Sequence, residues 1–179
     1  MLFLKQTFKI VILPLLVMST FSSFGLQTCK ENVTTPTTMH LVDNHNGMVS
    51  DSKTGLKWKK CSEGQSYNTN SNSCDNSAGT YNWSDALKQV QNVNSAIVGE
   101  NFGQSDWRLP NINELASIVE LSCYFPAINQ GVFSNTPRDK YWTSSPVAGS
   151  TSYIWIIGFN LGYDGTTLKN NNFRVRLVR

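Results

Sequence analysis

Few side chains in this sequence are of the kinds that perform acid–base or nucleophilic chemistry. Its two histidines, His40 and His45, lie in an N-terminal stretch where a solvated surface histidine is the usual interpretation. Glu114 and Glu120 are six residues apart, which places them on different faces of a helix and not as a glycosidase pair. No Gly-x-Ser-x-Gly elbow, His-Glu-x-x-His motif or phosphate-binding glycine loop occurs. The sequence therefore predicts a protein that is not an enzyme, without catalytic residues, metal or cofactor.

Binding chemistry has two candidate locations, and the first is a set of cations on two segments that we expect to be strands. These cations are Lys57, Lys59 and Lys60 around Trp58, and Arg174, Arg176 and Arg179 near the C-terminus. If the two segments neighbour each other, the six cations form a patch that binds sulfate or carboxylate groups through charge-assisted hydrogen bonds. The alternative is that they are solvated positions on edge strands, where lysine discourages edge-to-edge pairing.

The second candidate location is a late region rich in aromatic and asparagine residues. It comprises Tyr141, Trp142, Tyr153, Trp155, Tyr163 and the run Asn170-Asn171-Asn172. Most of these rings belong in the core, because large aromatic side chains mainly bury area. We expect some of them, with Tyr141, Trp142 and Tyr163 as the candidates, to line a ligand surface together with the six cations.

Residues 1–25 have the three-part order of a secretory signal peptide. Lys5 and Lys9 precede an apolar run from Ile10 to Met18, and small and polar residues follow as far as Gly25. The run is too short to span a bilayer, and no later segment approaches the roughly 20 apolar residues of a spanning helix. We expect an exported protein (periplasmic, cell-surface or extracellular) without a transmembrane segment.

The net charge of the exported chain is close to zero. The whole sequence has 15 Lys and Arg against 12 Asp and Glu, and removal of Lys5 and Lys9 with the signal peptide leaves 13 against 12. This balance gives no general attraction to nucleic acid or to an acidic membrane, so nucleic acid is not an expected partner. Any binding of polyanions has to come from a local patch.

The four cysteines of the exported chain predict two disulfides, although four cysteines allow three connectivities. We favour Cys61 with Cys74, because the segment between them is short, polar and turn-rich, and Cys29 with Cys123. Zinc binding is an alternative, but no two cysteines have the spacing of a zinc knuckle and no histidine lies near a pair. Cys29 has another alternative as the lipidated first residue of a lipoprotein, which the residues before it fit poorly.

The chain reads as one domain, residues 43–179, after an extended N-terminal arm, residues 26–42. Turn signals at Asn46-Gly47 and at 51–55 predict a β-hairpin region, in which Trp58 points inward and its lysine neighbours point outward. From residue 141 onward the pattern again predicts strands. They cover 141–144, 153–159 and 173–179, with a turn over 160–165.

Two helices are predicted between these regions. The first covers 82–97, with Asn82 as its N-cap. Its apolar face comprises Ala86, Leu87, Val90, Val93 and Ile97. The second begins after Leu109-Pro110, because a residue before proline is pushed out of the helical region. Asn111 is its N-cap, Glu114 completes a capping box, and Leu115, Ile118 and Val119 share its apolar face. The order of elements indicates an α+β domain with an antiparallel sheet.

Several segments in this order resemble the Lcl C-terminal domain family, secreted bacterial modules named after a collagen-like surface adhesin. They are Thr54-Gly55-Leu56-Lys57-Trp58, Tyr81-Asn82-Trp83-Ser84-Asp85-Ala86-Leu87, Asp106-Trp107-Arg108-Leu109-Pro110-Asn111, Pro126-Ala127-Ile128-Asn129, Tyr141-Trp142-Thr143-Ser144-Ser145 and Arg174-Val175-Arg176-Leu177-Val178-Arg179. The resemblance implies a C-type-lectin-like fold, with two helices packed on a mainly antiparallel sheet. For the named adhesin it implies a homotrimeric, non-enzymatic domain that binds sulfated polysaccharides and promotes attachment. This chain has no Gly-X-Y repeats and so no collagen stalk.

We therefore expect a secreted, non-enzymatic binding or adhesion domain of a bacterial cell surface that recognises glycans, sulfated or other anionic polysaccharides among them. The resemblance also makes a homotrimer an expected assembly. The alternative is a protein-binding or structural envelope module, because C-type-lectin-like folds also serve as receptor-binding scaffolds.

Overall fold

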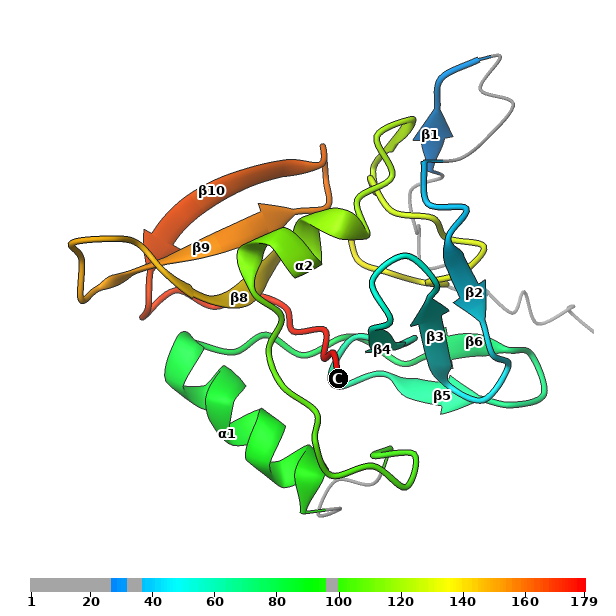
Figure 1. The fold of residues 1–179 in the computed structure, drawn as a ribbon, viewed down its shortest axis with the longest axis horizontal. Helices are drawn as coiled ribbons and strands as arrows, with labels where there is room; N and C mark the ends of the chain where they lie inside the picture. Colours follow the sequence, from blue (N-terminus) through cyan, green and yellow to red (C-terminus); the bar gives the residue numbers. More distant parts are fainter. Residues whose placement is uncertain (1–26, 32–36, 96–99) are drawn as a thin grey trace, which may run out of the picture.

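The computed structural model describes residues 27–31, 37–95 and 100–179. These residues form an α+β fold with two helices and ten strands, and the strands make four small antiparallel sheets (Figure 1). Neither helix in these ranges is long and apolar enough to cross a membrane. The predicted signal peptide and Ile97 lie outside the described residues.

The first three-stranded sheet contains β2 (Leu41–Asp43), β3 (Met48–Asp51) and β4 (Lys57–Lys59), with β3 in the middle. The reversal between β2 and β3 falls at Asn46-Gly47, where Gly47 has a positive φ of 84°. A side chain at this glycine would collide with the ring of Phe102, so both the turn and the packing favour glycine. The predicted hairpin region is confirmed.

The second three-stranded sheet contains β8 (Lys140–Pro146), β9 (Tyr153–Gly158) and β10 (Tyr163–Leu168), with β9 in the middle. The predictions of β8 and β9 are confirmed. The predicted turn over 160–165 is wrong in its second half, since β10 begins at Tyr163 and Gly165 pairs with Ile156 of β9. Asp-Gly is a common turn pair, but here the chain has already reversed at Gly162, whose φ is 77°.

Both helices begin at the residues that the sequence indicates. Helix α1 (Trp83–Asn94) is capped by the side chain of Asn82, and α2 (Ile112–Ser117) has a complete capping box between Asn111 and Glu114. Helix α2 is shorter than expected and ends at Ser117. Ile118 and Val119 are buried as predicted, but they belong to the segment after the helix and not to its apolar face.

The two helices cover opposite faces of the β8–β9–β10 sheet. Leu115 of α2 packs in a cluster with Tyr141 and Ile157. Ala86 and Val93 of α1 instead pack in a second cluster with Trp142 and Ile156, which are the residues next to Tyr141 and Ile157 in β8 and β9. Because adjacent residues of a strand point to opposite faces, the sheet separates two hydrophobic clusters. Leu87, predicted on the apolar face of α1, is exposed.

The C-terminal segment, residues 173–179, is not the half-buried strand that its alternating pattern predicts. It runs through the centre of the fold and makes single bridges to several other segments, including those of Trp58, Tyr81 and Arg108. Every residue from Val175 to Val178 is buried. The prediction is wrong because both faces of this segment are covered, so that one of its charged residues, Arg176, points into the protein.

Two smaller sheets carry the disulfides. Strand β1 (Thr28–Cys29) pairs with β7 (Cys123–Tyr124), and a disulfide joins Cys29 to Cys123. The disulfide of Cys61 and Cys74 closes a loop that contains β5 (Ser66–Asn68) and ends inside its hairpin partner, β6 (Ser73–Asp75). Both predicted pairings are present in the structure, in which all four cysteines are disulfide-bonded.

Candidate functional site

The two segments that carry the six predicted cations do lie side by side. The backbone N–H of Lys57 donates to the carbonyl of Arg179 at 3.0 Å, and that of Lys59 donates to Leu177 at 3.0 Å. Two of the lysines are nevertheless buried. Lys59 forms an ion pair with Glu63 at 2.7 Å, and Lys60 is bound to Asp43. Only Lys57 of the three extends into solvent.

Arg176 is the largest departure from the predicted patch, because none of its surface is exposed. Its Nη1 donates to the carbonyls of Lys59, at 2.9 Å, and Lys60. Its Nη2 donates to the hydroxyls of Ser62, at 3.2 Å, and Thr136, at 2.8 Å. These partners fix Arg176 as a structural residue. The prediction of one solvent-facing patch of six cations is therefore wrong, since three of them, Lys59, Lys60 and Arg176, are buried and bound by other protein groups.

Two of the predicted aromatic ligand residues are also part of the core. Tyr141 is fully buried and shares a hydrogen bond of 2.8 Å with the hydroxyl of Ser62. Trp142 is fully buried, and its Nε1 donates to the carbonyl of Tyr81 at 2.7 Å. Neither ring can contact a ligand, so both predictions are wrong. Tyr163 is partly buried against the second cluster.

The predicted acidic residues have structural partners. Glu114 caps α2 and pairs with Arg108 at 2.7 Å. Glu120 is buried and accepts hydrogen bonds from the hydroxyls of Thr37, Thr38 and Ser122. Although burial alone would raise the pKa of Glu120, these hydrogen bonds lower it to about 2. Arg179 of the predicted patch pairs with Asp106 at 2.7 Å.

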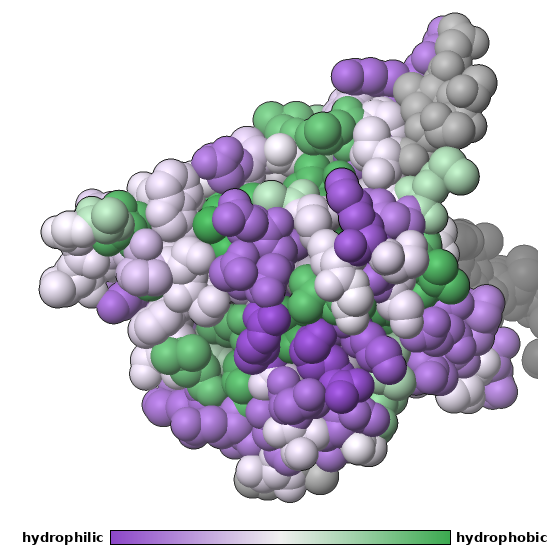
Figure 2. All heavy atoms as spheres, in the orientation of Figure 1, coloured by the Kyte–Doolittle hydropathy of each residue, from purple (hydrophilic) through white to green (hydrophobic). Residues whose placement is uncertain are grey.

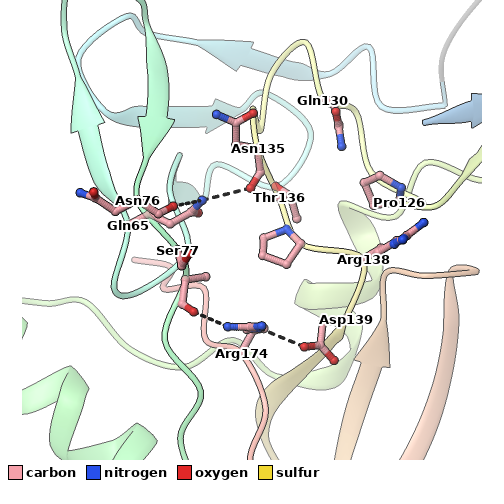
Figure 3. Close-up of a pocket in the computed structure, with 12 residues that line it drawn as sticks. Gln65, Asn76, Ser77, Pro126, Gln130, Asn135, Thr136, Arg138, Asp139 and Arg174 are labelled. Atoms are coloured by element: carbon pink, nitrogen blue, oxygen red, sulfur yellow. Dashed lines mark hydrogen bonds and ion pairs between the residues drawn. The ribbon is translucent and has the colours of Figure 1, made fainter. Parts of the chain in front are cut away.

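One predicted cation, Arg174, lines a pocket of about 320 Å³. The pocket lies between the segment after β6, the long connection from β7 to β8, and the C-terminal segment (Figure 3). We call it the Arg174 pocket. Its other lining residues include Asn76, Ser77, Pro126, Gln130, Asn135, Pro137, Arg138 and Asp139.

The guanidinium of Arg174 is held from two sides. Its Nε donates to Oδ2 of Asp139 at 3.0 Å, and its Nη1 donates to the carbonyl of Ala78 (Figure 3). Its Nη2 has no hydrogen-bond partner among the described residues, and the side chain retains 23% of its exposure. Arg174 is therefore oriented by the protein but keeps one donor available.

A second guanidinium stands on the opposite wall of the pocket. Arg138 is exposed, and its Cζ lies 5.9 Å from the centre of the Phe125 ring. Figure 3 shows its side chain near Pro126 and apart from that of Arg174. Two guanidinium groups against the single carboxylate of Asp139 leave this pocket with an excess of one positive charge.

Hydrogen bonds make the remaining wall rigid. Nε2 of Gln65 donates to the carbonyls of Asn135, at 3.0 Å, and Asn76, at 3.4 Å. Nδ2 of Asn135 donates to the carbonyl of Cys74 at 2.7 Å, which connects this wall to the disulfide with Cys61. Asn76 and Asn135 both have positive φ, a conformation that asparagine adopts more readily than most residues. The wall is formed before any ligand arrives.

The chemistry available in this pocket is that of recognition. Guanidinium groups bind planar anions with paired hydrogen bonds, and amides both donate and accept. In the part of the chain that the structure describes, no group of three or more His, Cys, Asp or Glu residues could hold a metal ion. The arrangement therefore suits an anionic ligand that also carries hydroxyl or amide groups.

Sequence reasoning found Arg174 but missed the rest of its pocket. The signal that was present is the run Asn135-Thr136-Pro137-Arg138-Asp139, in which turn residues and charges follow one another in a long connection. Long connections of this kind are frequently functional. Nothing in the sequence shows that this run folds against Arg174.

Comparison with known proteins identifies the family to which the chain belongs. No curated protein matches the chain. A family model described as the Lcl C-terminal domain matches residues 47–179, well over half of the chain and a range that contains every residue of the Arg174 pocket. The protein belongs to the Lcl C-terminal domain family.

Proposed function

We propose that this protein is a secreted, non-enzymatic binding domain that recognises anionic glycans at the Arg174 pocket. The observation that carries the proposal is the state of Arg174, whose guanidinium is fixed by Asp139 and Ala78 while Nη2 remains without a partner among the described residues. A fixed guanidinium loses little side-chain entropy when it binds a carboxylate or sulfate.

The surroundings of Arg174 favour a sugar over a simple inorganic anion. Gln130 and Asn76 supply amide groups that can donate to and accept from hydroxyls, and the partly exposed ring of Pro137 supplies apolar surface for the C–H face of a sugar ring. A pocket of about 320 Å³ lies within the range of small-ligand sites. Together these features suit one acidic sugar residue of a longer chain.

The proposal also includes a cell-surface or other exported location and a C-type-lectin-like scaffold. Two disulfides support export, because disulfides persist in oxidising compartments outside the cytoplasm. The scaffold assignment rests on the family resemblance and on the α+β arrangement of two helices about a small antiparallel sheet.

A glycan array with sulfated, uronate-containing and neutral chains tests the function, with each hit titrated with NaCl. We expect binding to anionic chains that weakens as salt rises, because salt screens exposed charges. Arg138→Gln and Arg174→Gln should each weaken binding by about tenfold, the size expected for a charge-assisted hydrogen bond. Lys57→Gln is the matched control, since it removes one exposed positive charge outside the pocket.

Two outcomes of this experiment would contradict the proposal. One is the absence of any glycan hit at low salt. The other is an equal loss of binding in Lys57→Gln, which would mean that general charge and not the pocket attracts the ligand.

The alternative function, a protein-binding module, is favoured by a different surface. Leu121, Tyr124 and Phe125 are exposed on the segment after α2 that contains β7. The hydrogen bond from the N–H of Phe125 to the carbonyl of Asn160 brings exposed Leu161 beside them. Figure 2 shows hydrophobic groups gathered over this loop. Exposed apolar groups of this kind mark protein contacts, including those of a homotrimer.

Sedimentation velocity tests this alternative directly. If the wild-type protein forms a trimer or a larger assembly, the two variants are compared. Dissociation in Leu161→Ser but not in Leu168→Ser would show that the exposed apolar residues around Leu161 mediate self-association. Leu168 is a suitable control because it is an exposed leucine on β10, away from this loop.

A further inference from the structure

A second pocket, of about 290 Å³, adjoins the Arg174 pocket. Gln65 lines both of them, and the preceding residue, Gly64, lines the second. The residues of this second pocket that can hydrogen-bond through their side chains are Lys59, Glu63, Gln65, Ser66, Tyr81, Gln89 and Glu100. None of them belongs to the site described above except Gln65.

Most of the charge in the second pocket is already balanced. Glu63 is buried, with Oε1 2.7 Å from Nζ of Lys59 and with Oε2 accepting from Nε2 of Gln89 at 3.0 Å. Lys59 is equally buried, so this pair contributes no net charge. The carboxylate of Glu100 is additional and leaves the pocket with an excess of one negative charge.

Two hydrogen-bonding groups at this pocket remain unused in the described part of the chain. Glu100 accepts from the backbone N–H of Tyr67 at 3.0 Å through Oε1, while its buried Oε2 has no partner. The hydroxyl of Tyr81 has no hydrogen bond either. Burial and the nearby Glu63 carboxylate raise the pKa of Tyr81, so its hydroxyl keeps its proton and can donate. Buried polar atoms without partners are rare and call for a ligand or water.

We propose that the second pocket is a subsite for an uncharged sugar ring that follows the acidic ring bound in the Arg174 pocket. This inference rests on the proposed glycan-binding function. The hydroxyls of an uncharged sugar both donate and accept, so they can accept from the hydroxyl of Tyr81 and donate to the carboxylate of Glu100, which line the same pocket. The excess negative charge disfavours a second acidic ring. The ligand is then a chain in which acidic and uncharged sugars alternate.

Two unsulfated tetrasaccharides test the inference by titration calorimetry. In one, glucuronic acid alternates with N-acetylglucosamine, and in the other every ring is galacturonic acid. General electrostatic attraction favours the second chain, which carries more charge. We expect the wild-type protein instead to bind the alternating chain about tenfold more tightly, the equivalent of one hydrogen bond to a charged group.

Variants of the second pocket should remove this preference. Glu100→Gln keeps the acceptor for Tyr67 but removes the negative charge, so binding of the all-acidic chain should improve severalfold. Tyr81→Phe should weaken binding of the alternating chain severalfold and leave free glucuronic acid unaffected. Asp164→Asn is the control, since it removes an exposed carboxylate on β10. Thermal unfolding of each variant verifies that it is folded.

The outcomes distinguish this inference from the function on which it depends. If the wild-type protein binds no acidic glycan, the proposed function fails and the inference fails with it. If it binds acidic glycans through Arg138 and Arg174 but prefers the all-acidic chain, or if Glu100→Gln and Tyr81→Phe leave the preference unchanged, only the inference is overturned.

Discussion

Arg174 and Arg176 are two residues apart and end in opposite situations. Arg176 is fully buried, and four oxygen atoms of the protein accept from its two terminal nitrogens. Arg174 has one terminal nitrogen bound and one available at the wall of a pocket. The comparison teaches that a cation reports on ligand binding only when the fold leaves one of its donors unused where a ligand can reach it, since Arg176 also has an unpaired donor, Nε, but that atom is buried.

The same contrast extends to the regions around the two arginines. Around Arg176 the buried charges of Lys59, Lys60 and Glu63 are paired with one another or with Asp43. Around Arg174 a single carboxylate faces two guanidinium groups. The first region is a polar part of the core, and its substitution should cost stability. The second is an unsaturated surface, and its substitution should cost binding.

The largest expected effect is that of Arg176→Leu, which tests whether the buried region is structural. The substitution leaves two carbonyls and two hydroxyls without their donor in the interior, so the free energy of unfolding should fall by about 3–5 kcal/mol. Urea denaturation followed by tryptophan fluorescence measures this. A loss below about 1 kcal/mol would break the comparison, because Arg176 would then not hold the region together.

The second-largest effect on stability is expected at Glu120, a buried carboxylate that accepts hydrogen bonds from hydroxyls of the protein. Its pKa in the folded protein, about 2, lies below the ordinary value of 4.5, so ionised Glu120 stabilises the fold above pH 4.5. This stabilisation, about 3 kcal/mol at most, is lost as the pH falls from 4.5 to 2. The difference in unfolding free energy between wild type and Glu120→Gln should shrink over this interval. A difference that stays constant would show that Glu120 titrates normally.

A smaller effect is expected at the start of α2, where the polar groups are satisfied but exposed to water. Asn111→Ala removes the side chain that accepts from the N–H of Glu114, which should lower stability by about 1 kcal/mol. Asn113→Ala, at an exposed position inside the same helix, should have no such cost. Chemical denaturation of both variants separates capping from a general effect of losing asparagine.

The smallest effect on stability is expected in the pocket itself. Arg138→Ala should change the free energy of unfolding by no more than about 0.5 kcal/mol, because its guanidinium is exposed and has no ion pair among the described residues. Differential scanning calorimetry measures the change. A destabilisation above about 1 kcal/mol would place Arg138 with the structural residues and would weaken the distinction between the two regions.

The features that could be predicted from the sequence are those that depend on neighbouring residues. The capping box of Asn111 and Glu114, the turn at Gly47 and the disulfide of Cys61 with Cys74 all involve short separations. Their geometry is fixed by local backbone preferences, so residue type and spacing are sufficient. The burial of Trp58 followed from the same kind of local pattern.

The candidate site could not be predicted, because its parts come together only in the tertiary fold. Arg176 occupies an outward position in the alternating pattern of its segment and is buried because other segments cover both faces. Lys59 is buried for a similar reason, through its pair with Glu63. The β5–β6 hairpin was missed because its two three-residue strands are mostly polar and contain no β-branched residue. Hydrophobic periodicity gives no signal for such strands.

The disulfide between Cys29 and Cys123 has a mechanical consequence. It joins a two-residue strand to the segment beyond α2 and bypasses 94 positions of sequence. Tension applied to the chain before Cys29 would pass through this covalent bond into β7, so β2, β3 and α1 would carry none of the load. Such a pull would not unravel the domain from its first strand, and the part of the Arg174 pocket formed by Gln65 and Asn76 would lie outside the loaded path.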